Sequence, residues 1–136
     1  MMPEFVVDTS VLIAIFKLEP EASLFEDILI ASPWAISTGS VLEARIWLIR
    51  NPGLSALDPF PVLLAAPHCQ MIAFGPEQEA IATDAYARFG KGQHQAQLNF
   101  GDCMAYATAH TMKLPLLFKG TDFSLTDVKR HPNSVS

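Results

Sequence analysis

The sequence has few cysteines, no long apolar run and no recognisable leader, and each of these scarcities excludes a class of protein. Its two cysteines, Cys69 and Cys103, lack the spacing of metal ligands, so we expect them to be small buried side chains. No apolar run approaches the roughly 20 residues that a membrane-spanning helix needs. The first residues carry neither the basic segment nor the small-residue cleavage site of a signal peptide. We therefore expect a cytoplasmic protein without a membrane partner.

Basic residues are also scarce. The chain has 9 Lys and Arg against 14 Asp and Glu, which gives a formal net charge of −5. This balance argues against a protein that holds nucleic acid by a general basic field, because phosphate contacts need Lys and Arg. A cluster of carboxylates that binds cations would not be visible in the total. The charge therefore leaves the partner open.

Apolar residues are abundant. They make up 50% of the 136 residues, and charged residues only 17%, which excludes a disordered chain. The length predicts a single domain over residues 1–136, large enough to bury a core. The polar segment 128–136 is expected to be a frayed tail.

Short apolar segments alternate along the chain with segments of helical periodicity. Strands are expected over 4–8, 34–37 and 70–74, and a strand followed by a turn over 114–123. Helices are expected over 9–17, 19–32, 40–50, 57–66, 76–90 and 101–113. This alternation is typical of a parallel sheet with helices on both faces. The predicted fold is a three-layer α/β/α domain with a central, mainly parallel sheet.

Four acidic residues occupy related places in this pattern. Asp8 ends the first strand, Asp122 follows the last one, and Glu43 and Asp102 lie in the opening turns of two helices. Ligands in such folds bind at the carboxyl ends of the strands, where the following helices also begin. Four carboxylates gathered there repel one another unless some are protonated or a cation joins them. Mg²⁺ or Mn²⁺, which prefer oxygen ligands, would suit this set.

Each acid also has a purely structural interpretation. Asp8 could cap the helix that follows it, and Glu43 is the fourth residue of a capping box in form. Asp102 could stabilise the dipole of its helix, and Asp122 could be a turn residue. The residue pattern leaves both interpretations open.

Four segments of the chain together resemble the PIN-domain ribonucleases, and they look most like the VapC toxins of bacterial type II toxin–antitoxin pairs. The similarity covers nearly the whole chain in the expected order, and its last two segments are the most specific. The segments are VVDTSVLIAIF, SVLEA, GQHQAQLNFGDCMAYATA and LLFKGTDFSLTDV.

The resemblance implies a function as well as a PIN-like fold. It makes Asp8, Glu43, Asp102 and Asp122 the catalytic, metal-binding acids, with Asp127 as a second candidate for the last position. It implies endonucleolytic cleavage of RNA that depends on Mg²⁺ or Mn²⁺. It also implies a cognate VapB-type antitoxin as partner, and a homodimer.

Two other functions remain open at this stage. One is a metal-dependent DNA nuclease or phosphatase that uses the same acids, and the other is a non-catalytic PIN-like RNA-binding module. A phosphatase with an aspartyl nucleophile normally has Asp-x-Asp after the first strand. Here the stretch is Asp8-Thr9-Ser10, which counts against a phosphatase of this kind.

The resemblance also matches Ser10 to a small hydroxyl residue that often supports the site of the family.

Overall fold

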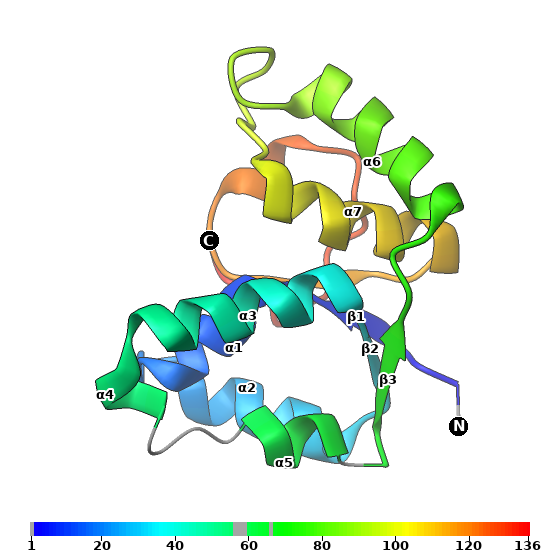
Figure 1. Ribbon diagram of the computed structural model, residues 1–136. Coiled ribbons are helices and arrows are strands. Elements are labelled where there is room, and N and C mark those ends of the chain that lie inside the picture. Colours follow the sequence, from blue (N-terminus) through cyan, green and yellow to red (C-terminus); the bar gives the residue numbers. More distant parts are fainter. Residues whose placement is uncertain (1, 56–59, 66) are drawn as a thin grey trace.

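The structure is a computed structural model that describes residues 2–55, 60–65 and 67–136. Within these ranges, helices and strands alternate along most of the chain (Figure 1). Their order is β1 (Phe5–Val7), α1 (Thr9–Phe16), α2 (Ala22–Ala31), β2 (Trp34–Ser37), α3 (Thr38–Arg50), α4 (Pro52–Ser55), α5 (Phe60–Ala65), β3 (Cys69–Ile72), α6 (Pro76–Phe89), α7 (Phe100–Met112), β4 (Leu116–Leu117) and the short 3₁₀ helix η1 (Asp122–Leu125).

The four strands form one sheet in the order β3-β2-β1-β4. All of its pairings are parallel, with Val6 of β1 lying between Ala35 of β2 and Leu116 of β4. Parallel neighbours need crossover connections, and helices supply these between each pair of consecutive strands. The predicted fold class, a three-layer α/β/α domain with a parallel sheet, is confirmed.

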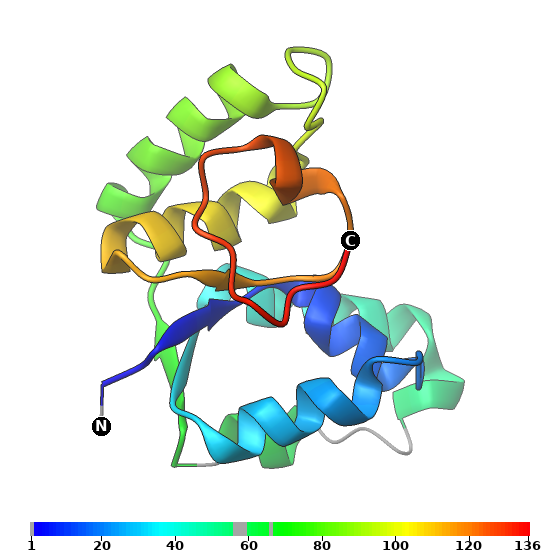
Figure 2. The same cartoon turned by 180° about the vertical axis from the view of Figure 1, so that it is seen from behind.

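Helices cover both faces of the sheet. Figures 1 and 2 show α1, α2 and α5 on one side of the strands and α6 and α7 on the other. Helix α3 packs on α1 and also contacts α7. Successive residues of a strand point to opposite faces, so Val7 belongs to the core on the α1 side and Val6 to the core on the α7 side. The short strands are apolar because both of their faces are buried.

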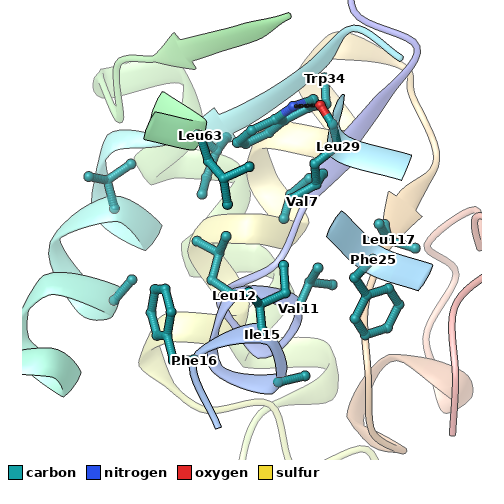
Figure 3. Close-up of a cluster of buried hydrophobic side chains, with 14 of the residues drawn as sticks. Val7, Val11, Leu12, Ile15, Phe16, Phe25, Leu29, Trp34, Leu63 and Leu117 are labelled. Carbon is teal, nitrogen blue, oxygen red and sulfur yellow. Dashed lines mark hydrogen bonds between the residues drawn. The ribbon is translucent and has the colours of Figure 1, made fainter. Parts of the chain in front are cut away.

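The core on the α1 side is built around large side chains that solvent does not reach. Figure 3 shows Leu12 and Ile15 of α1 packed among residues of the sheet and of the neighbouring helices. Trp34 is fully buried, and its indole N–H donates to the carbonyl of Leu29 at 3.0 Å. This bond satisfies the one polar group that the indole takes into the core.

Most of the predicted elements are present with shifted ends. The strand expected over 34–37 has those bounds, and the helix expected over 76–90 ends at Phe89 with Gly90 as its C-cap. Helix α3 begins two residues earlier than expected, and α2 begins three residues later, because the chain turns after Pro20. Of the helix expected over 57–66, residues 60–65 form α5, whereas 57–59 and 66 lie outside the described residues. None of the helices in the described part of the chain has the length and apolar character to cross a membrane.

The prediction of a frayed tail over 128–136 is wrong. This segment returns along β4: the Leu116 N–H donates to the Lys129 carbonyl at 2.8 Å, and the Leu116 carbonyl accepts from the His131 N–H at 3.0 Å. The buried hydroxyl of Ser134 donates to Leu116 and accepts from the Phe118 N–H. Without the tail, β4 would expose an unpaired edge. Backbone hydrogen bonds hold this segment beside β4. Its polar sequence does not predict that pairing.

Candidate functional site

Asp8 directly follows β1 and is buried, with 4% of its surface exposed. One carboxylate oxygen accepts from the Ser10 N–H at 3.0 Å, so Asp8 caps α1. A side-chain cap satisfies one of the backbone donors that the first turn of a helix leaves free. The structural interpretation of Asp8 is therefore correct, and it leaves the second carboxylate oxygen available to the site.

Asp102 lies in the first turn of α7 and is 8% exposed. It forms a reciprocal capping box with Asn99: the Asp102 N–H donates to Asn99 Oδ1 at 2.8 Å, and the Asn99 N–H donates to Asp102 Oδ2 at 3.0 Å. The bond from the Asn99 N–H holds the Asp102 carboxylate at the start of the helix, where the helix dipole also favours negative charge. Asn99 was not singled out from the sequence, although an Asn three residues before an acid is a recognisable capping pattern.

Glu43 does not belong to a capping box. Helix α3 starts at Thr38, and its N-cap is Ser37, whose hydroxyl accepts from the Gly39 N–H at 3.1 Å. Glu43 therefore lies in the second turn, and the expectation that it sits in the opening turn is wrong. The helix begins earlier because Ser37, the last residue of β2, already provides the cap.

The side chain of Glu43 instead lies against α7. A Cβ built on Gly101 would come 2.0 Å from Glu43 Oε2 and 2.7 Å from Oε1. Only glycine at position 101 leaves room for this carboxylate next to Asp102. Gly101 was missed as a functional residue, and the glycine directly before Asp102 is the signal that could have found it.

Two of the acids, Asp8 and Asp102, have raised pKa values, mainly because they are buried. Burial, together with the nearby charge of Glu43, raises the pKa of Asp8 to about 6, although hydrogen bonds from Ser10 oppose the shift. Burial and the charge of Asp8 raise the pKa of Asp102 to about 8, and Asp122 adds to this shift. Asp8 thus interacts with Glu43 and Asp102, and Asp102 also interacts with Asp122.

The two candidates for the last acid lie in different surroundings. Asp122, the first residue of η1, interacts with Asp102. Asp127 accepts from the Tyr106 hydroxyl and pairs with Arg88 at 3.1 Å. Burial would raise the pKa of Asp127, but these two partners outweigh it and hold the pKa below its usual value. Of these two residues, only Asp122 interacts with another of the candidate acids.

Ser10 connects Asp8 to the segment that carries Asp122. Its hydroxyl interacts with the Asp8 carboxylate and accepts from the Lys119 N–H at 3.0 Å. The ammonium group of Lys119 pairs with Glu19 at 3.1 Å and with Glu21 at 2.8 Å. These contacts hold the turn after β4 against the start of α1 and the α1–α2 connection.

The four carboxylates are the oxygen ligands that Mg²⁺ and Mn²⁺ prefer. Two of them, Asp8 and Asp102, have pKa values raised by burial and, in addition, by a neighbouring carboxylate, and a cation would stabilise their charged forms. In this arrangement, no three His, Cys, Asp or Glu side chains of residues 2–55, 60–65 and 67–136 are gathered closely enough to hold one ion. Metal binding would therefore require side-chain rotations that bring the carboxylates together. With such rotations, the four carboxylates would fit Mg²⁺ or Mn²⁺ as oxygen ligands.

Two cavities, each of about 580 Å³, lie beside the acids and share Lys91 and Asn99. The polar groove runs between the 91–99 loop and η1, and it includes Asp122. Its lining consists of Lys91, Gln95, Ala96, Gln97, Asn99, Thr121, Asp122, Ser124, Leu125 and Ser136. The apolar cavity lies between α6 and the start of α7. Its lining consists of Phe74, Glu79, Ala82, Thr83, Tyr86, Lys91, Asn99, Phe100, Cys103 and Met104.

Comparison with known proteins identifies the family. The family model described as "PIN domain" matches residues 5–129. A ribonuclease VapC of Mycolicibacterium smegmatis is 42% identical over 127 residues, which cover 90% of this chain and 96% of the relative. The chain belongs to the VapC group of the PIN domain family. Ribonuclease VapC30 of Mycobacterium tuberculosis is a further relative, 38% identical over 130 residues that cover 90% of this chain and 95% of that protein.

Solved structures of the same group share the fold. VapC20 of Mycobacterium tuberculosis superposes with a TM-score of 0.70 at 16% identity, over 93% of this chain and 98% of that one. VapBC2 of Rickettsia felis, bound to a DNA fragment from its promoter, gives a TM-score of 0.69 at 10% identity over 97% and 96% of the two chains. At these identities the structural likeness supports the fold alone, and the family assignment rests on the family model and the closer relatives.

Proposed function

We propose that the protein is a metal-dependent endoribonuclease and the toxin of a toxin–antitoxin pair. The observation that carries the proposal is the pairwise proximity of Asp8, Glu43, Asp102 and Asp122: Asp8 interacts with Glu43 and Asp102, Asp102 interacts with Asp122, and the Glu43 carboxylate lies against Gly101. Family membership supports it, because relatives about 40% identical are ribonucleases named VapC.

The four acids would hold Mg²⁺ or Mn²⁺. A bound ion of this kind supplies a water of lowered pKa and stabilises negative charge on a phosphodiester. Asp8 and Asp102 gain most from it, because a cation stabilises the charged form of carboxylates whose pKa values are raised by burial and by a neighbouring charge. Asp122 is the fourth acid in this proposal, since Asp127 is engaged by Tyr106 and Arg88.

The protein's own residues fix where a phosphodiester would react. Asn99 holds the Asp102 carboxylate through a backbone hydrogen bond, and Ser10 does the same for Asp8. Asp122 lies in the wall of the polar groove, and Asn99, which holds the Asp102 carboxylate, lines the same groove. An RNA strand in this groove would present its phosphate to them. No Ser, Cys or His nucleophile is needed for this chemistry.

The partner in this proposal is a VapB-type antitoxin. One solved relative in fold is a toxin–antitoxin complex of Klebsiella pneumoniae, and another is the VapBC2 complex. The acids themselves would attract an Arg of the partner, because the guanidinium pairs bidentately with carboxylates. A homodimer of the toxin is part of the same proposal.

A direct test uses purified protein and three labelled substrates: single-stranded RNA, DNA of the same sequence, and a generic phosphomonoester. Each is incubated with Mg²⁺, with Mn²⁺ and with EDTA. We expect internal cleavage of RNA with either metal and none with EDTA. Cleavage of DNA alone or of the phosphomonoester alone would replace the proposal with another metal-dependent hydrolase, and binding of RNA without cleavage would indicate a non-catalytic module.

A further inference from the structure

The apolar cavity is continuous with the groove of the acids. Lys91 and Asn99 line both, so the two share an edge. Asn99 is also the residue whose backbone N–H holds the Asp102 carboxylate. A molecule that lies in the polar groove with a phosphate near the acids would therefore have the apolar cavity directly beside it.

Phe100 gives this cavity an unusual wall. It is the first residue of α7, two positions before Asp102, and it is 79% exposed although it is aromatic. The floor is apolar, since Cys103 and Met104 on the next turn are buried and face the same cavity. An exposed aromatic ring at the rim of an apolar cavity offers a face on which a planar ligand can stack.

The cavity also has a polar end. The hydroxyl of Thr83 donates to Glu79 Oε1 at 3.1 Å, and both residues lie on exposed turns of α6. Lys91 lines both the cavity and the groove that contains Asp122, and so places a cation where the two adjoin. An apolar slot with hydrogen-bonding groups and a cation in its lining matches a flat heterocycle attached to a phosphate chain.

We propose that the apolar cavity binds one unstacked nucleobase of the RNA, next to the phosphodiester held at the acids, with Phe100 as its stacking surface. The inference rests on the proposed function and specifies its substrate as single-stranded RNA. A volume of about 580 Å³ lies within the range of cavities that hold small molecules, roughly 300–1,000 Å³. Stacking on aromatic side chains is the usual way in which proteins hold single-stranded bases. Lys91 pairs with a phosphate flanking the bound base.

The test compares an RNA decamer with an abasic ribose decamer that carries the same phosphates. Dissociation constants are measured by fluorescence anisotropy in EDTA, where the RNA is not cleaved, for the wild type and four variants. Phe100→Ala removes the stacking surface, and Thr83→Trp fills the cavity from its exposed rim. Ile49→Ala removes an exposed apolar side chain on α3, and Ala87→Trp adds the same indole to an exposed position of α6 outside the cavity.

We expect the wild type and both controls to bind RNA on the order of tenfold more tightly than the abasic chain. Phe100→Ala and Thr83→Trp should lose most of this preference while their affinity for the abasic chain stays unchanged. RNA containing 5-iodouridine should crosslink on irradiation to residues of the cavity.

Three results would overturn the inference: equal binding of the two decamers by the wild type, an equal loss for both decamers in the two cavity variants, or no binding of either decamer. A lower molecular mass of Phe100→Ala and Thr83→Trp than of the wild type in light scattering, with RNA binding intact, would likewise show that a second copy of the chain covers the cavity. The proposed function is judged separately. Cleavage of RNA without a preference for RNA over the abasic chain in binding would support the ribonuclease function and refute the nucleobase site. Binding of the base without any cleavage would support the nucleobase site and refute the ribonuclease function.

Discussion

The carboxylate of Glu43 lies directly over the Cα of Gly101, so that a methyl group at this position would come 2.0 Å from Oε2. This contact joins α3 to the start of α7 and places a third acid beside Asp102. Because Gly101 has no side chain, the Glu43 carboxylate has room to lie at this position. The relationship also gives the most specific test of how Glu43 contributes.

Gly101→Ala should fold normally and lose activity. Alanine favours a helix over glycine by about 1 kcal/mol, and the atoms it would meet are the flexible end of Glu43, so thermal stability in EDTA should be unchanged or slightly higher. Displacement of the carboxylate should lower Mn²⁺-dependent RNA cleavage by about tenfold or more.

Two variants make this prediction decisive. Gly53→Ala is the matched control, because a Cβ at position 53 would meet nothing within 4 Å. In a Glu43→Gln background, Gly101→Ala should add little further loss, since both changes act through the same carboxylate. Additive losses in the double variant would show that the alanine acts elsewhere.

Asp8→Asn and Asp102→Asn should each reduce metal-dependent cleavage by about a hundredfold or more, with the fold retained. An amide still accepts the capping hydrogen bonds but does not carry the charge that a cation needs. Asp127→Asn should retain most of the activity, because Asp127 is bound to Tyr106 and Arg88. Steady-state cleavage of a labelled RNA measures all three. Loss of activity in Asp127→Asn with full activity in an Asp122→Asn variant would move the fourth acid to position 127.

The raised pKa values predict how the stability of the metal-free protein depends on pH. The folded-state pKa values of Asp8 and Asp102, about 6 and about 8, lie above their unfolded values. The folded state therefore binds more protons than the unfolded state between about pH 4 and pH 8, and stability falls as pH rises through this range. In EDTA, the Tm of Asp102→Asn relative to wild type should rise by several degrees from pH 5 to pH 8.

The same melts contain a control of opposite sign. The pKa of Asp127 is lowered by its partners, so its contribution is present at neutral pH and is lost only as pH falls through its folded-state pKa. Asp127→Asn should therefore lower the Tm at pH 8. An equal change of Tm between pH 5 and pH 8 in the wild type and in Asp102→Asn would contradict the clustering of the acids.

Ser10 should act on the site through Asp8. Its hydrogen bonds oppose the rise in the pKa of Asp8, and its hydroxyl also accepts from the Lys119 N–H. Ser10→Ala should move the acidic limb of the pH–activity profile to higher pH and lower kcat more than it raises KM. Ser10→Thr keeps the hydroxyl and should restore the profile. An unchanged acidic limb in Ser10→Ala would remove Ser10 from the site.

The sequence predicts the layers of this fold well because its signals are local. Buried parallel strands read as short apolar runs, and the helix over 76–90 is marked by a proline at its start and a glycine at its end. Asp8 and Asp102 are predictable for the same reason, since both stand at boundaries between elements. Asp122 follows from its place after the last strand.

What the sequence does not reveal depends on contacts between distant segments. The tail over 128–136 is ordered by backbone pairing with β4, which polar side chains do not indicate. The Glu43 carboxylate contacts Gly101 only because α3 packs against α7. The choice between Asp122 and Asp127 depends on Arg88, which pairs with Asp127. These relationships exist only once the helices are packed.

Titration calorimetry of Mn²⁺ into the wild type, Asp102→Asn and Asp127→Asn tests the central claim most directly, because it measures the ion at the acids without any substrate. We predict saturable binding to the wild type at about pH 8, at least tenfold weaker binding to Asp102→Asn, and wild-type affinity in Asp127→Asn. Absence of Mn²⁺ binding to the wild type, or equal affinity in the wild type and Asp102→Asn, would contradict the account that these acids form a metal centre.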